Sequence, residues 1–136
     1  MKWEGASCIC VHDGKMLMVL QGLPQEEKRW SVPSGGREGN ESLEACCIRE
    51  VWEETGYVVK IIQKLHSKEG ISQGIHYKVQ YFSAEMISGS PVIQDPDGLI
   101  YDIRWVSLEE LDTLTLSFPE DRVLLCSYLS QSENLT

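Results

Sequence analysis

Residues 42–55 are the segment that most constrains the fold, because the sequence marks both ends of a helix there. Ser42 is a favourable N-cap, since its hydroxyl can accept a hydrogen bond from an unpaired amide of the first turn. Glu44 complements the helix dipole in that turn, and Gly56 can adopt the left-handed conformation that ends a helix. We therefore predict one helix over 42–55.

The two sides of this helix differ in chemistry. At about 100° per residue, an apolar stripe falls on one side and is predicted to face the core; it comprises Ala45, Ile48, Val51 and Trp52. Glu50, Glu53 and Glu54 fall on the other side, three and four residues apart, so their carboxylates converge. This acidic side is either a solvated helix face or a site for a cation.

The loop before the helix favours a cation site. Gly35 and Gly36 allow a close approach of the backbone, which can point carbonyl oxygens toward the carboxylates. Carboxylate and carbonyl oxygens are the ligands that Mg²⁺ or Mn²⁺ prefers. An EF-hand calcium site is excluded, because the chain has no D-x-[DN]-x-[DN]-G loop. On these residues alone, the solvated face stays open as the alternative.

The rest of the chain mixes strands and helices without a strict βαβ order. Asp13-Gly14 is a turn signal between two apolar runs, and it predicts a hairpin of 6–11 and 16–20. Further extended segments are predicted at 29–33, 57–65, 76–86 and 98–106, and helices at 107–111 and 119–129. This pattern predicts an α/β fold, a mixed sheet covered by helices, in a single domain over 1–136 with a frayed tail at 130–136.

Charge and composition exclude several classes of function. The net charge of −9 argues against an extended nucleic-acid surface, which needs many lysine and arginine contacts. No apolar run approaches the roughly 18 residues of a membrane span, and the N-terminus lacks the features of a secretory signal. The five cysteines include no C-x-x-C pair and suggest neither a disulfide framework nor a zinc site. We expect a cytoplasmic protein with a small-molecule partner and no membrane partner.

The glycine loop and the helix together resemble the Nudix box, G-x5-E-x7-R-E-U-x-E-E-x-G-U, in which U is a bulky apolar residue. The matching positions are Gly35, Glu41, Arg49, Glu50, Val51, Glu53, Glu54, Gly56 and Tyr57, of which Tyr57 is a loose match. The flanking stretches RWSVPSGG and YDIRWVSLEEL are similar to the family's strand before the box and to its last strand and helix. The resemblance covers most of the chain and implies an α/β/α sandwich around a mixed sheet.

The resemblance to these MutT-like pyrophosphohydrolases implies an activity. The reaction would be metal-dependent hydrolysis of a diphosphate linkage in a nucleoside diphosphate derivative, such as a nucleoside triphosphate, with water attacking phosphorus. Glu53 is expected to be the base, followed by Glu50, and Arg49 is expected to orient one of the carboxylates.

The resemblance also implies a ligand set for Mg²⁺ or Mn²⁺. The carboxylates of Glu50, Glu53 and Glu54 would bind the metal together with the backbone carbonyl of Ser34 or Gly35. A late acidic residue often adds a ligand in this family. Asp102 is predicted in that role, ahead of Asp97 and Glu69.

Side chains outside the box are candidates for substrate binding. Trp30, Tyr77 and Tyr81 could stack on a base, although aromatic residues on strands often belong to the core. Arg29 could contact phosphate. The alternative to an enzyme is a non-catalytic nucleotide-binding or sensor module of the same fold; the presence of every box acid favours the enzyme. Analogy with the family also suggests a homodimer.

Overall fold

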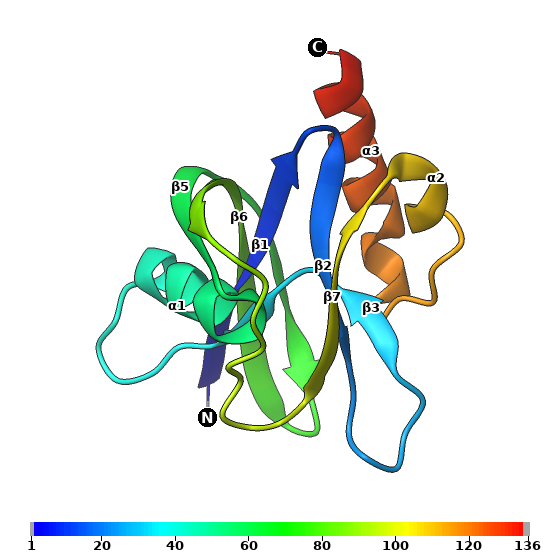
Figure 1. The fold of residues 1–136 in the computed structure, drawn as a ribbon. Coiled ribbons are helices and arrows are strands. Elements are labelled where there is room, and N and C mark those ends of the chain that lie inside the picture. Colours follow the sequence, from blue (N-terminus) through cyan, green and yellow to red (C-terminus); the bar gives the residue numbers. More distant parts are fainter. Residues whose placement is uncertain (1, 135–136) are drawn as a thin grey trace.

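The computed structural model describes residues 2–134, which form a mixed seven-stranded sheet with helices on both faces (Figure 1). The strands are β1 (Lys2–His12), β2 (Lys15–Gln21), β3 (Arg29–Ser31), β4 (Ser34–Gly36), β5 (Tyr57–Ser72), β6 (Ile75–Gly89) and β7 (Ile100–Val106). The helices are α1 (Leu43–Thr55), α2 (Leu108–Leu111), the 3-10 helix η1 (Pro119–Asp121) and α3 (Arg122–Asn134). The predicted α/β class with a mixed sheet is confirmed.

The hairpin of β1 and β2 joins two parts of the sheet. Asp13 and Gly14 have φ values of 51° and 74° and form the predicted tight turn between His12 and Lys15. Beyond Val11 and Met16 the two strands separate. β1 then pairs with β4 and, in parallel, with β6, whereas β2 pairs with β3 and β7. The sheet therefore opens into a part with the order β4-β1-β6-β5 and a part with the order β3-β2-β7.

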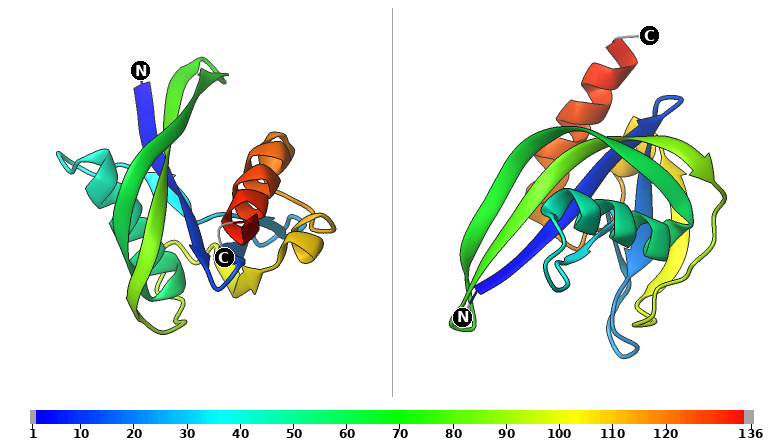
Figure 2. Two further views of the ribbon diagram at one scale, coloured as in Figure 1. Left: turned by 90° about the horizontal axis from the view of Figure 1, so that it is seen from above. Right: turned by 90° about the vertical axis from the view of Figure 1, so that its left-hand side faces the viewer.

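Helices cover both faces of β1 and β6, and Figure 2 shows α1 and α3 on opposite sides of these strands. Alternate residues of the central strands serve two cores. One core contains Cys8 and Phe82 and packs on α1, whereas the other contains Ile9 and Tyr81 and packs on α3. Because both faces are buried, the central strands carry the nearly continuous apolar runs of the sequence.

The helix α1 confirms the predicted ends but not the predicted core side. The hydroxyl of Ser42 accepts a hydrogen bond from the amide of Ala45, and Gly56 ends the helix with a φ of 80°. Val51 is buried and Ile48 packs beside the core as predicted. The prediction for Ala45 and Trp52 is wrong, since both are exposed.

The core side of α1 is rotated from the predicted stripe. It carries Cys46 and Cys47 as well as Val51, and Glu54 near the end of the helix is buried too. Hydrophobic patterning favoured the large Trp52 over the two small thiols, but only the small side chains fit between α1 and the sheet.

The hairpin of β5 and β6 is longer than predicted. Its strands continue beyond the predicted segments 57–65 and 76–86 to a turn at Gln73 and Gly74, which have φ values of 51° and 78°, so Glu69 lies in a strand. Three register shifts along β5 let this long ladder twist. The outer half of the hairpin is mostly exposed and polar, which hid the strand pattern.

The C-terminal helix α3 also extends past its predicted end at residue 129 and continues to Asn134. Residues 130–134 of the expected frayed tail are thus helical, and residues 135–136 lie outside the described part of the chain. Within that part, no helix is both long and apolar enough to cross a membrane.

Replacement of Gly56 by alanine should destabilise the fold. A Cβ atom there would collide with the backbone carbonyl of Ser90, in addition to the strain of a positive φ, and the expected loss in free energy of unfolding is about 2 kcal/mol or more. Urea denaturation would measure it. Gly98→Ala is the matched control, because Gly98 has a φ of +67° but open space around it. Equal losses in the two variants would contradict the collision.

Candidate active site

Arg49 is the centre of a network that joins α1 to the loop before it. Its guanidinium donates hydrogen bonds to Glu41 (2.6 Å from Nη2), Glu50 (2.8 Å from Nη1) and Glu53 (3.0 Å from Nη1). It also donates to the backbone carbonyl of Gly36, at 2.9 Å. These bonds, led by the one to Glu41, raise the pKa of Arg49 above its already high usual value. The arginine therefore fixes the carboxylates in position while keeping its charge.

Gly35 and Glu50 lie in direct contact across this network. A Cβ atom on Gly35 would overlap the carboxyl group of Glu50, so a larger residue at this position would displace that carboxylate. The Gly35 carbonyl accepts a hydrogen bond from the thiol of Cys46, at 3.5 Å. The backbone carbonyls of Gly35 and Gly36 in β4 thus face α1, where they contact Cys46 and Arg49.

Glu54 is the buried member of the acidic group, with only 5% of its surface exposed. Its Oε1 accepts a hydrogen bond of 3.3 Å from the amide of Ser34. Burial, followed by the neighbouring Glu50, raises the pKa of Glu54 well above its ordinary value. The same two causes, in the same order, raise the pKa of Glu53. This end of the molecule therefore has negative charge that the protein itself neutralises only in part.

The donor set is consistent with a hard divalent cation. It combines the carboxylates of Glu50, Glu53 and Glu54 with the backbone of Ser34 and Gly35, and the space that a Gly35 side chain would fill belongs to Glu50. Within residues 2–134, no three His, Cys, Asp or Glu side chains already have the spacing of a metal cage. Arg49 instead bonds two of the three carboxylates.

The late acidic residues lie elsewhere than predicted. Asp102 of β7 contacts Arg104 at 3.9 Å, and its neighbours Ile103 and Trp105 are the side chains of β7 that pack toward the α1 core. Strand alternation therefore turns Asp102 away from α1, and the structure does not bring it to the glutamates. Asp97 lies in its own loop, where its backbone amide donates a hydrogen bond to the carboxylate of Asp95.

Asp95 is the acidic residue that the sequence did not single out. Its charge contributes to the raised pKa of Glu54, and its loop is bound to the end of α1, where the amide of Gln94 donates to the carbonyl of Glu53 at 2.7 Å. The carboxylate of Asp95 accepts from the amides of Asp97 and Leu99. The motif QDPDG signals a turn, but nothing in it predicts where that turn docks.

A pocket of about 940 Å³ is lined at one place by Ser34 and Gly35, whose backbone contacts Glu54 and Glu50; the glutamates themselves do not line it. Tyr77 and Tyr81 of β6 also line it. Tyr81 is buried, and its hydroxyl donates to Asp121 at 2.7 Å. Two of the four predicted substrate-binding residues are therefore at this pocket.

The other two predicted substrate-binding residues lie away from it. Trp30 is buried in the α3 core, with the guanidinium of Arg104 4.7 Å from its ring centre. Arg29 lines a different pocket, together with Phe118. The contacts of Trp30 agree with its interpretation as a core residue.

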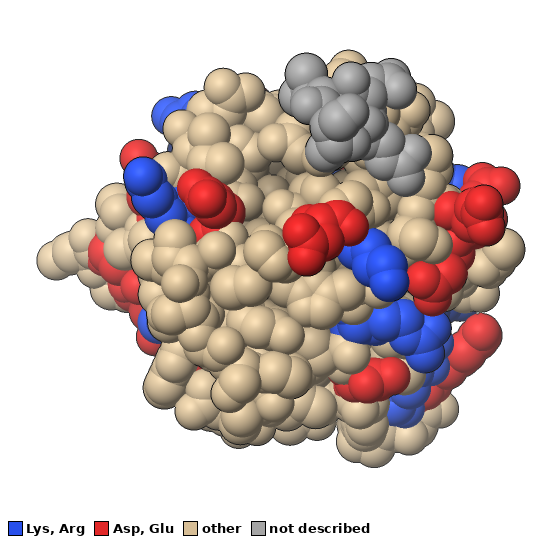
Figure 3. Space-filling model, turned by 45° about the horizontal axis from the view of Figure 1, so that its top comes forward, with Lys and Arg blue, Asp and Glu red and all other residues tan. Residues whose placement is uncertain are grey.

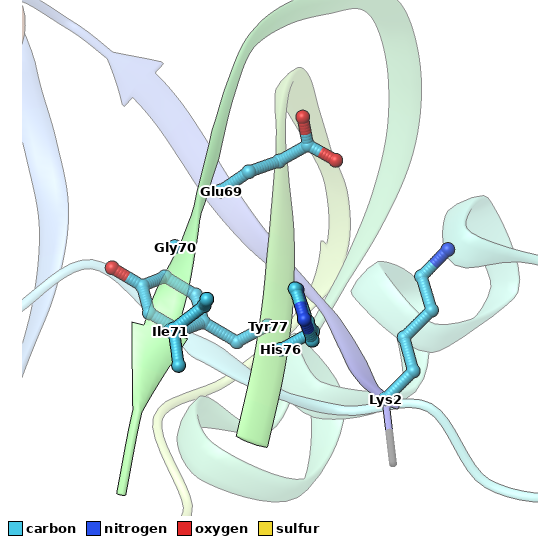
Figure 4. Close-up of a pocket in the computed structure, with 6 residues that line it drawn as sticks. All are labelled: Lys2, Glu69, Gly70, Ile71, His76 and Tyr77. Carbon is cyan, nitrogen blue, oxygen red and sulfur yellow. The ribbon is translucent and has the colours of Figure 1, made fainter. Parts of the chain in front are cut away.

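A third hollow lies at the outer end of the β5–β6 hairpin and has a volume of about 680 Å³. Figure 4 shows its lining, in which Glu69 extends from β5 while Lys2 extends from β1. Glu69, the last of the candidate late acids, thus belongs to this outer hollow.

On the face in Figure 3, acidic and basic side chains lie intermixed among uncharged residues, unlike a continuous basic surface.

Comparisons with known proteins agree with this geometry. The family model for the NUDIX domain matches residues 1–127. Nudix hydrolase 5 of Arabidopsis thaliana is 30% identical over 101 residues, which are 72% of this chain but 33% of that protein. The chain therefore spans about a third of the length of this plant relative.

A bacterial relative and a solved structure are similar over more of their length. Phosphatase NudJ of Escherichia coli (strain K12) is 28% identical over 105 residues, or 77% of this chain and 68% of that protein. A NUDIX hydrolase from Nitrosomonas europaea superimposes with a TM-score of 0.81 at 23% identity, covering 98% of this chain and 90% of that one. With an acidic helix braced by Arg49 and a family match over nearly its whole length, the chain belongs to the Nudix hydrolase family.

Proposed function

We propose that this chain hydrolyses a diphosphate linkage in a nucleoside diphosphate derivative with the help of Mg²⁺ or Mn²⁺. The observation that carries the proposal is the buried Glu54, which lies near Glu50 and accepts a hydrogen bond from the backbone amide of Ser34, a residue that also lines a large pocket. A cation would offset the cost of this buried negative charge, and it would hold the acidic substrate near acidic side chains.

The residues have separate roles in this proposal. Glu50, Glu53 and Glu54 would supply both the carboxylate ligands of the cation and the base, and the carbonyl of Ser34 or Gly35 would complete the coordination; the cation lowers the pKa of water and neutralises phosphate charge when bound. A carboxylate left free of the cation takes the proton of the attacking water, as the new phosphorus–oxygen bond forms and the bond to the bridging oxygen breaks. Glu53 is our first choice for this base and Glu50 the second.

Arg49 and Glu41 act through position. Arg49 bonds both candidate bases and the Gly36 carbonyl, so it orients the carboxylates rather than the substrate. Glu41 holds the other side of the guanidinium and also caps the amide of Glu38 at 2.9 Å. Asp102 is not included in this ligand set, because its side chain faces away from α1.

Two further expectations remain proposals. All five cysteines are unpaired thiols, which supports a reducing compartment such as the cytoplasm; tagged protein found outside the cytoplasm by fractionation would contradict this. A homodimer rests on analogy with the family, and a monomer mass in light scattering would reject it.

Glu53→Gln should lower turnover by about 10²–10⁴-fold, the usual contribution of a general base, without loss of fold. Phosphate release would be measured on nucleoside triphosphates, dinucleotides and nucleotide sugars with Mg²⁺. Glu44→Gln, an exposed position in the first turn of the same helix, is the control. Unchanged release by Glu53→Gln would refute its role, and a folded wild type that turns over none of these substrates would indicate the binding module instead.

Mg²⁺ should raise the melting temperature, because binding would relieve repulsion around the buried Glu54. At a concentration about 100-fold above Kd the expected stabilisation is about 2.7 kcal/mol. Scanning calorimetry at constant ionic strength would measure it. Glu54→Gln should be more stable than wild type without metal and should respond weakly to Mg²⁺. A flat response of the wild type would count against the metal site.

Glu41→Gln should lower the free energy of unfolding at pH 7 by roughly 1.5–3 kcal/mol, the range for a hydrogen bond to a charged group. Hydrogen bonds from Arg49 hold the pKa of Glu41 below its usual value of 4.5. A lowered folded pKa stabilises the protein above the unfolded pKa, and the contribution is lost as the pH falls through the folded pKa. The difference between wild type and variant in urea denaturation should therefore shrink below pH 4.5. A difference that stays constant with pH, or an equal effect in the exposed Glu109→Gln control, would contradict this role.

A further inference from the structure

The pocket that Ser34 and Gly35 line has a second region, which the box does not supply. Lys68 of the β5–β6 hairpin, Phe118 and Glu120 line it together with Tyr81. We call this region the Lys68 end. Phe118 is 43% exposed, so part of this residue is open to a ligand. Most residues that line the pocket belong to the β4-β1-β6-β5 part of the sheet and its hairpin turn. The lining residues from elsewhere in the chain are Gln21, Phe118 and Glu120.

Lys68 ties the two sides of this end together. Its ammonium lies 3.0 Å from the carboxylate of Glu120 and 3.0 Å from that of Asp121. Both acidic residues come more than fifty positions after Lys68 in the chain. It also lies 4.9 Å from the ring centre of Phe118 and 5.6 Å from that of Tyr81. The lysine side chain is only 18% exposed, so this contact is a fixed part of the wall rather than a surface ion pair.

The positive charge of Lys68 is therefore not available to a substrate phosphate. One ammonium faces two carboxylates, which gives the cluster a net charge of −1, and Tyr81 holds Asp121 from the other side at 2.7 Å. Burial opposes the charge of Lys68, but hydrogen bonds with Tyr81, Glu120 and Asp121 outweigh this and raise its pKa. Burial and the bond to Asp121 raise the pKa of Tyr81 to about 12, so it remains a neutral donor.

We propose that the Lys68 end is a subsite for an uncharged planar group of the substrate, and that Lys68 shapes it by holding the β5–β6 hairpin against Phe118 and Glu120. The inference rests on the proposed function, because it assigns the diphosphate to the glutamates and the organic group to this end. The exposed part of Phe118 offers stacking, whereas the net negative charge disfavours an anionic group. Lys68 is thus a positioning residue.

Two probes separate this subsite from the proposed metal site. Uncharged nucleosides (adenosine, guanosine, cytidine and uridine) test the Lys68 end, and methylenebisphosphonate with Mg²⁺, which cannot be hydrolysed, tests the glutamates. Titration of the full chain by NMR should show binding of both. Lys68→Met should weaken the best nucleoside at least fivefold and leave the affinity for the bisphosphonate unchanged, and with a hydrolysable substrate it should raise KM more than it lowers kcat.

Controls distinguish position from general damage. Lys68→Arg should restore nucleoside binding to within about twofold, because it can keep both ion pairs. Lys64→Met, an exposed lysine of the same strand, should change neither probe. Phe118→Ala should weaken the nucleoside alone, by roughly tenfold. Bisphosphonate binding without any nucleoside binding, or full nucleoside binding by Lys68→Met, would overturn the subsite. Nucleoside binding without bisphosphonate binding or turnover would instead reject the proposed function.

A milder variant tests the charge of this end even if Lys68→Met does not fold. Glu120 is 58% exposed in its side chain, and Glu120→Gln leaves the pair of Lys68 and Asp121 with no net charge. Nicotinamide and nicotinate have the same ring and differ in charge. The wild type should prefer nicotinamide, and Glu120→Gln should reduce that preference at least threefold. An unchanged preference, or a wild type that favours nicotinate, would overturn the assignment to an uncharged group.

Discussion

The bonds of Arg49 are the interaction on which the acidic end of the molecule depends. Three glutamates from two segments and a backbone carbonyl meet around one guanidinium, which is planar and has enough donors to serve them all. Without it, Glu50 and Glu53 would repel each other at the distance that the helix imposes. The short contact of Gly35 with Glu50 depends on the same arrangement, because the carboxylate must be held still for the backbone to lie against it.

The sequence predicted those parts of the structure that depend on short-range rules. The caps of α1, the Asp13-Gly14 turn and the spacing of the three glutamates are local, and each is visible in a few neighbouring residues. The resemblance to the Nudix box additionally predicted the role of the loop that precedes the helix. These features are sufficient to place the acidic residues and the glycine of β4 near one another.

The failures share a different cause, which is that distant segments decide them. Trp52 is exposed and Glu54 is buried because of what packs on α1, including the loop of Gln94, and not because of the helical period. The charge of Asp95 reaches Glu54 through that same docking. In the sequence, Lys68 is one of several polar residues of its strand. Its contact with Asp121 of η1 becomes apparent only in the folded structure. Sequence patterns do not predict such contacts between distant residues when neither residue belongs to a recognisable motif.

The division of the pocket wall between β4 on one side and the β5–β6 hairpin with Phe118 and Glu120 on the other has a consequence for how such a protein can change. The groups proposed for chemistry come from β4 and α1, whereas the Lys68 end combines the tip of the β5–β6 hairpin with η1. Only Ser34 and Gly35 of the first set line the pocket with the second set, and the bonding partners of Arg49 and of Lys68 have no residue in common. Substitutions in the hairpin tip and around Phe118 can therefore accumulate without disturbing Arg49, so selection can alter what is recognised while the hydrolytic apparatus is inherited unchanged.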